Sequence, residues 1–136
     1  MPLTVTQGGD FLGTGGNTRP NLIADPKGPE TIVQWFNTAA FAAATTNFGT
    51  AGRGIIIGPG VNNWDISLVK NFRWRENLRL RFSTDFINAF NHLNPGNPNV
   101  SPTFDATLKQ TNTNFGRITT VAREPRIIQV GLKFNF

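Results

Sequence analysis

The stretch 126–136, RIIQVGLKFNF, decides the fold, because apolar and polar residues alternate along its length. Every second position is apolar: Ile128, Val130, Leu132, Phe134 and Phe136. The positions between them are polar or small: Gln129, Gly131, Lys133 and Asn135. A period of two predicts a β-strand with these sets on opposite faces, and only Ile127 is an apolar residue on the polar face. Such a strand needs an apolar medium on one side, either the core of a soluble sheet or lipid.

Two further alternating stretches precede this strand and are separated by the polar segment 73–77. In 63–72 (NWDISLVKNF) one face is apolar: Trp64, Ile66, Leu68 and Phe72. In 78–90 (LRLRFSTDFINAF) one face is again apolar: Leu78, Leu80, Phe82, Phe86 and Phe90. The opposite faces are polar: Asp65, Ser67 and Asn71 on the first stretch, and Arg79, Arg81, Ser83 and Asp85 on the second. Val69 and Lys70 break the alternation, but the two stretches together predict an antiparallel hairpin with a short turn.

Most of the remaining chain is predicted to be loop, since the 136 residues include 14 Gly and 9 Pro and only 38% are apolar. Residues 1–6 are expected to be the end of a strand, and residues 7–62 a long irregular loop. A second long loop is expected over 91–125, with a weaker strand at 115–122.

Short elements are also predicted inside the first loop. We expect a turn or two of helix near 29–36 and near 39–44, and a brief strand at 55–57. No internal repeat is found, and one structural unit is expected. The predicted fold class is therefore all-β: an antiparallel meander of about three to five strands, with long irregular loops and a short loop helix.

Composition argues against several functions. The chain has no cysteine, which excludes disulfides and thiolate metal sites, and its net charge of +5 is spread without a basic run. His92 is the only histidine and has no cluster of carboxylates near it in sequence, so no metal or catalytic site is predicted. Asp65 and Asp85 lie on different strands and are expected to line a polar surface rather than to act as an acid–base pair. We expect no enzyme, no cofactor and no nucleic-acid partner.

The pattern is compatible with a membrane barrel. No stretch of 18 apolar residues predicts a membrane helix, but barrel strands cross with about ten residues each, the length of the three strong strands. Aromatic residues, which favour membrane interfaces, lie near the strand ends: Trp64, Phe72, Trp74, Phe90, Phe134 and Phe136. Amphipathic hairpins also build soluble sandwiches, so the pattern alone leaves both media open. So few strands cannot close a barrel, and in lipid they would belong to a larger structure.

Five segments, in order, resemble the C-terminal end of TonB-dependent outer-membrane receptors, most closely the large receptors with a carboxypeptidase-like regulatory domain. They are 35–41 (WFNTAAF), 58–68 (GPGVNNWDISL), 86–92 (FINAFNH), 114–118 (NFGRI) and 125–136 (PRIIQVGLKFNF). Thr38 stands where the family segment has Pro. The likeness extends over nearly the whole chain.

The resemblance implies a fragment of a 22-stranded transmembrane β-barrel in the bacterial outer membrane. The segments would follow the family order: strand end 1–6, extracellular loop 7–62, descending strand 63–72, periplasmic turn 73–77, rising strand 78–90, extracellular loop 91–125 and descending terminal strand 126–136. Phe136 resembles the terminal aromatic residue that the barrel assembly machinery reads. Residues 1–5 lack the features of a signal peptide, so we expect a cut N-terminus.

The resemblance also implies a role for each face of the strands. Residues expected to face lipid are Trp64, Ile66, Leu68, Phe72, Leu78, Leu80, Phe82, Phe86, Ile128, Val130, Leu132 and Phe134. Residues expected to face the barrel lumen are Asp65, Ser67, Arg79, Arg81, Asp85, Gln129 and Lys133. The implied partners are outer-membrane lipid, the rest of the barrel with its plug, the assembly machinery and, only through a full-length receptor, the TonB complex.

The sequence departs from the family by lacking the plug domain, the energy-coupling box and most barrel strands. We therefore expect a fragment that cannot transport alone, the structural C-terminal part of a receptor that takes up an unknown substrate. The alternative is a small soluble β-sheet binding module.

Overall fold

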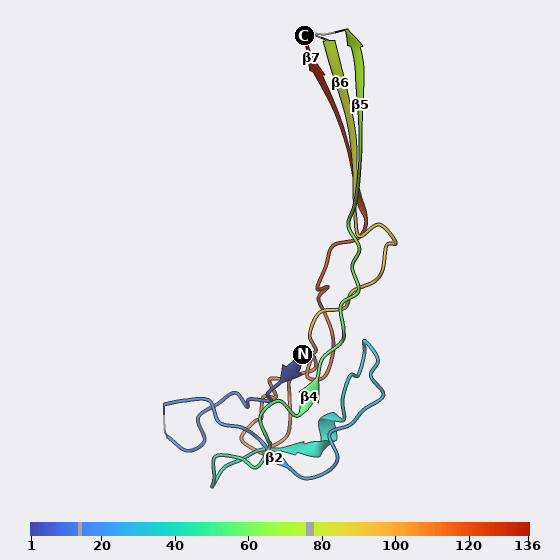
Figure 1. Ribbon diagram of the computed structural model, residues 1–136. Helices are drawn as coiled ribbons and strands as arrows, with labels where there is room; N and C mark the ends of the chain where they lie inside the picture. The colour runs from blue at the N-terminus through green and yellow to red at the C-terminus, as the bar shows by residue number, and fades with distance from the viewer. Residues whose placement is uncertain (14, 76–77) are drawn as a thin grey trace. The chain divides into compact units, whose positions relative to one another are not determined.

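The computed structural model describes residues 1–13, 15–75 and 78–136, which form two compact units. Unit 1 comprises Met1–Gly60 and Pro95–Val121, and unit 2 comprises Val61–Asn94 and Ala122–Phe136. The expectation of one structural unit is wrong, because the long loops fold around apolar residues of their own. The described residues form short and long strands and a single three-residue helical turn, which confirms the all-β fold class (Figure 1).

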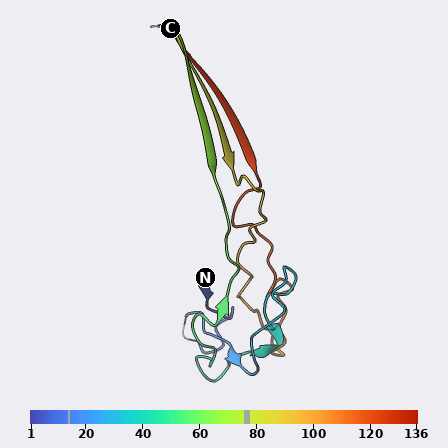
Figure 2. The ribbon, with the colours of Figure 1, turned by 45° about the vertical axis from the view of Figure 1, so that its right-hand side comes forward.

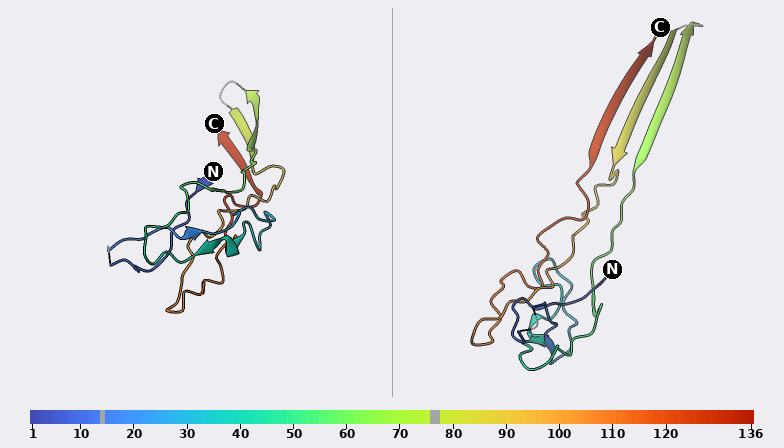
Figure 3. Two further views of the ribbon diagram at one scale, coloured as in Figure 1. Left: turned by 90° about the horizontal axis from the view of Figure 1, so that it is seen from below. Right: turned by 90° about the vertical axis from the view of Figure 1, so that its left-hand side faces the viewer.

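The three long strands belong to unit 2 and form one antiparallel sheet in the order β5-β6-β7. They are β5 (Ile66–Arg75), β6 (Leu78–Ile87) and β7 (Ile127–Asn135). Figures 1 and 2 show them side by side, and the right-hand view of Figure 3 shows β6 running opposite to its two neighbours. The alternating, aromatic-rich and β-branched sequence of these segments suits a pleated surface, which explains why they form strands.

The long strands differ from the predicted stretches mainly at their ends. β5 begins at Ile66, three residues later than predicted, and continues to Arg75. β6 ends at Ile87 because Asn88 has a φ of 51° and starts a turn. Residues 73–75 of the predicted turn 73–77 belong to β5, and residues 76–77 lie outside the described part of the chain.

Unit 1 is organised around a small aromatic core. The rings of Phe36, Phe41 and Phe115 meet edge to face with centroids 5.1–5.8 Å apart, and Val5 and Ile56 are buried beside them. Phe115 comes from the second long loop, so this core joins both parts of unit 1. Two short antiparallel pairs complete it: β1 (Pro2–Leu3) with β4 (Ile56–Ile57), and β2 (Asn21–Leu22) with β3 (Phe41–Ala42).

The helix expected near 29–36 is wrong, because this segment is a tight hairpin. The backbone N–H of Glu30 donates to the Trp35 carbonyl at 3.1 Å, and that of Thr31 donates to the Gln34 carbonyl at 3.0 Å. Glu30 has a φ of 55°, which a right-handed helix does not allow. The chain therefore reverses direction here instead of coiling.

Three smaller predictions concern the loops. The helix expected near 39–44 is found only as the 3-10 helix η1 (Thr38–Ala40), and Phe41–Ala42 form the strand β3 instead. The cap of η1, Asn37, accepts from the Ala39 N–H at 3.2 Å. The brief strand at 55–57 is found as β4. The strand expected at 115–122 is wrong, because this segment makes only isolated bridges, and Gly116 with a φ of 81° sits in a turn there.

Candidate membrane-facing sheet

One face of the sheet in unit 2 is apolar. Its residues form four rows across β5, β6 and β7: Ile66–Phe86–Ile128, Leu68–Thr84–Val130, Lys70–Phe82–Leu132 and Phe72–Leu80–Phe134. Residues directly opposite one another in an antiparallel sheet share a face. Within these rows, only Thr84 and Lys70 are not apolar.

This apolar face is exposed along its length. Leu132 is 70% exposed, Val130 62% and Leu68 61%. Phe82 and Phe86 are half-buried on the central strand β6, with neighbours on both sides. A soluble sheet covers such a face with a second layer, whereas a large uncovered apolar patch marks contact with an apolar partner.

Aromatic rings lie at both ends of the apolar face. Where β5 begins, the rings of Trp64 and Phe90 pack edge to face with centroids 6.4 Å apart. At the other end, Phe72 and Phe134 lie in the last row, and the Phe134 ring is 6.2 Å from that of Phe136. The first and last rows are separated by about 20 Å along the strand, given a rise of about 3.3 Å per residue. The side chain of Trp74, also expected at this end, lies outside the described part.

Lys70 is the one charged residue in the apolar rows. Its Nζ lies 5.9 Å from the centroid of the Phe72 ring, so the side chain extends toward the aromatic end of the sheet. A lysine can lay its aliphatic stem on an apolar surface while its ammonium reaches a polar boundary or an aromatic ring. Lys70 is therefore compatible with an otherwise apolar face.

The opposite face is polar and becomes cationic toward the β5–β6 turn. Its rows are Ser67–Asp85–Gln129, Val69–Ser83–Gly131, Asn71–Arg81–Lys133 and Arg73–Arg79–Asn135. Arg81 lies opposite Lys133, and Arg73 lies opposite Arg79, with no ion pair for these four among the described residues. Like charges placed directly opposite one another destabilise a strand pair. This end of the face therefore favours anionic or strongly hydrogen-bonding surroundings.

Buried amide side chains close the other end of the sheet. Asn88 is 1% exposed, and its Nδ2 donates to the carbonyls of His92 at 3.0 Å and Glu124 at 3.1 Å. Its Oδ1 accepts the His92 N–H at 3.0 Å. Asn94 is equally buried, and its Oδ1 accepts the Asn62 N–H at 2.7 Å. Sequence reasoning missed these roles; the cluster of asparagines in 88–94 was the only signal.

The structure places the predicted site residues as follows. Of the set expected to face lipid, Trp64 precedes β5, and the side chain of Leu78 lies outside the described part; the other members share the apolar face. The set expected to face the lumen shares the opposite face, except for Asp65. Asp65 precedes β5, and its Oδ1 accepts hydrogen bonds from the Asn88 N–H and from Asn63 Nδ2, both at 2.9 Å. Its carboxylate thus links the residue before β5 to the residue after β6. Phe136 follows β7 and is 95% exposed.

His92 has a structural environment. Its ring lies 6.0 Å from that of Phe90, and its backbone is bonded to Asn88. Within 1–13, 15–75 and 78–136, no group of three or more His, Cys, Asp or Glu residues could hold a metal ion. A bilayer-spanning apolar helix does not occur in these ranges either.

An exposed apolar face with aromatic ends, backed by a polar face, is typical of the wall of a transmembrane β-barrel. A family model for an outer membrane beta barrel domain matches residues 1–129, nearly the entire chain. The chain belongs to this family, which places the protein in the bacterial outer membrane and confirms the expected location. No curated protein and no solved structure matches the chain.

Proposed function

We propose that β5, β6 and β7 are adjacent strands in the wall of a larger transmembrane barrel. The apolar rows contact lipid, and the polar rows line the interior. The observation that carries this proposal is that the apolar rows are exposed on one face of a sheet whose opposite face has charged residues. The side chain of Leu132, for example, is 70% exposed. Each strand is also long enough to cross, with nine or ten residues.

The free edges of the sheet support a larger assembly. β5 and β7 each pair with β6 alone among the described strands, so each has one unpaired backbone edge. In hydrocarbon, each unpaired N–H or C=O costs several kcal/mol. Further strands must therefore pair with both edges, and they belong to the rest of the barrel.

We further infer that the barrel is a TonB-dependent receptor that takes up a substrate not yet identified, with this chain as its structural C-terminal portion. The five resembling segments, which extend from 35 to 136, support this inference. In this proposal unit 1 supplies outer loops, the plug lies within the barrel, and the assembly machinery reads Phe136. The TonB complex acts only on the full-length receptor, and the chain has no catalytic role.

Cysteine labelling tests the membrane assignment, because the chain has no native cysteine. Val130→Cys and Gln129→Cys are neighbours on opposite faces of β7. In isolated outer membranes, a water-soluble maleimide should label Q129C and leave V130C largely unmodified, while both should react after unfolding in detergent. Equal labelling of the two in folded membranes, or recovery of the chain as a soluble monomer, would contradict the proposal.

The receptor assignment needs a separate test. The DNA upstream of the Met1 codon should continue in frame and encode more alternating strands, a plug and an energy-coupling box. An upstream sequence that encodes barrel strands without a plug would leave the barrel proposal standing and overturn the receptor proposal.

A further inference from the structure

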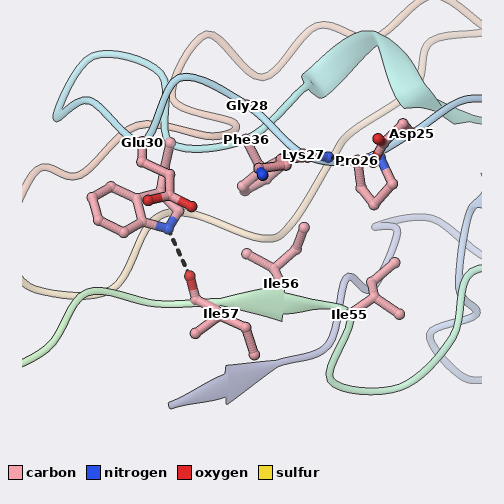
Figure 4. Close-up of a pocket in the computed structure, with 10 residues that line it drawn as sticks. Asp25, Pro26, Lys27, Gly28, Glu30, Phe36, Ile55, Ile56 and Ile57 are labelled. Atoms are coloured by element: carbon pink, nitrogen blue, oxygen red, sulfur yellow. Dashed lines mark hydrogen bonds between the residues drawn. The ribbon is translucent and has the colours of Figure 1, made fainter.

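Unit 1 contains a cavity of about 280 Å³ between β4 and the hairpin that follows Asp25. Figure 4 shows Ile55, Ile56 and Ile57 along one side and Asp25, Phe36 and Glu30 along the other. Trp35 also lines the cavity. Small-molecule sites usually have roughly 300–1,000 Å³, so this cavity lies just below that range and has room for a very small ligand only.

The walls of the cavity are held in place by the fold. Trp35 Nε1 donates a 2.7 Å hydrogen bond to the Ile57 carbonyl, the dashed line in Figure 4. Ile56 is 3% exposed and belongs to the core, and Phe36 is 2% exposed. Because its N–H is already bonded, the Trp35 indole has no hydrogen-bond donor left for a ligand, and its contribution to the lining is its aromatic ring.

Glu30 is the unusual residue of this cavity. Its φ of 55° is rare for a long side chain, and such strain tends to persist where the surrounding structure or a function requires it. Its backbone N–H is bonded to the Trp35 carbonyl at 3.1 Å. Its carboxylate has no hydrogen-bond or ion-pair partner in the described part of the chain. The cavity therefore has an unpaired negative charge in a lining that also includes Trp35.

The lining also has a negative charge balance, because Asp25 and Glu30 face only one cation, Lys27. Asp25 Oδ1 already accepts the backbone N–H of Lys27 at 2.9 Å. We propose that the cavity binds a small organic cation, an amine or guanidinium on an apolar body. Its charge pairs with Glu30 and lies against Trp35, and its apolar part contacts Ile55. This inference goes beyond the proposed barrel function and depends on unit 1 alone.

The test uses the full chain, labelled with ¹⁵N in detergent micelles, and benzylamine as the probe. The chain has three tryptophans, so Trp35→Phe identifies the Trp35 indole N–H resonance. Benzylamine should shift this resonance in a saturable way and leave that of Trp64, in unit 2, in place. Benzyl alcohol has nearly the same shape without the charge and should bind about fivefold more weakly.

Variants of Glu30 separate binding from folding. Glu30→Gln should weaken benzylamine binding about fivefold, the upper range for an exposed ion pair. Glu30→Gly removes the carboxylate but suits the positive φ, so it should lose affinity without lowering the stability of unit 1. Glu124→Gln, a carboxylate of unit 2, is the matched control and should bind as the parent does. Equal affinity for benzylamine and benzyl alcohol, or unchanged affinity in E30Q, would overturn the proposal.

Discussion

The backbone N–H of Asn88 donates a 2.9 Å hydrogen bond to Oδ1 of Asp65, 23 residues earlier in the chain. Asp65 directly precedes β5, and Asn88 directly follows β6. A side chain thus joins the two strands where β5 begins and β6 ends, next to the 2.8 Å backbone bond from the Ala89 N–H to the Trp64 carbonyl. Asp65 therefore holds the start of β5 to the end of β6, a role that the alternation of polar and apolar residues did not predict.

Replacing Asp65 should therefore loosen this end of the sheet. In Asp65→Ala the N–H of the buried Asn88 loses its acceptor, at a cost of about 1–3 kcal/mol. Hydrogen exchange of the Asn88 amide should become faster. Asp65→Asn keeps an acceptor oxygen and should stay closer to the parent. Faster exchange throughout β5 and β6, with no local effect at Asn88, would contradict this role.

A charge in the middle of the apolar face should be costly in a membrane. Val130→Arg places a guanidinium in the row of Leu68 and Thr84, and arginine at the bilayer midplane costs about 2–4 kcal/mol in barrels. The midpoint of urea unfolding in lipid vesicles should fall. Gln129→Arg, on the opposite face, is the control and should change the midpoint much less. Similar losses in both variants would argue against lipid on the apolar side.

The two rows of the polar face that have like charges opposite one another, Asn71–Arg81–Lys133 and Arg73–Arg79–Asn135, allow a test of charge pairing. Lys133 lies opposite Arg81, so Lys133→Glu replaces a repulsive cross-strand pair with an attractive one. We expect a gain of about 0.2–1 kcal/mol for the chain in micelles, decreasing as salt is added. Lys133→Gln removes the repulsion alone and should gain less. If K133E lowers stability, an acidic group must already neutralise Lys133.

Asp105 should make a turn of unit 1 sensitive to acid. The Thr107 hydroxyl, at 2.6 Å, and the Lys109 N–H, at 3.0 Å, bond to Oδ1 and lower the pKa of the Asp105 carboxyl. Because this pKa is lower in the folded state, the stabilisation is present above the unfolded-state pKa and is lost as pH falls through the folded-state value. The Thr107 and Lys109 amide resonances should titrate together below the usual aspartate range. In Asp105→Asn they should not respond to pH there.

The sheet could be predicted from the sequence because successive side chains of a strand point to opposite faces, so the face of each residue follows from its position along the strand. The register keeps even the exceptions where alternation put them. Lys70 lies opposite Phe82 on the apolar face, and Ile127 lies opposite Ile87 on the otherwise polar face. The two-residue period can be read from neighbouring residues alone, and the pairing of the long strands keeps residues of the same kind on the same face.

Unit 1 could not be predicted in this way. Its core depends on the packing of Phe115 on Phe36, and these two residues come from loops that are far apart in sequence. Its strands have only two residues each. No periodicity can appear in two residues. Likewise, an asparagine such as Asn88 looks the same in sequence whether its amide is in solvent or buried. Such roles emerge only from contacts that form after the chain has folded.

The two unpaired edges of the sheet, on β5 and β7, also affect a chain that has not joined the other strands of a barrel. A long, flat, apolar strand with open backbone groups is a template on which identical chains stack without limit. β7, at nine residues with Lys133 as its only charge, has little that would block such stacking. A misplaced copy is thus a seed for aggregation, and the cell must escort it to the membrane or degrade it.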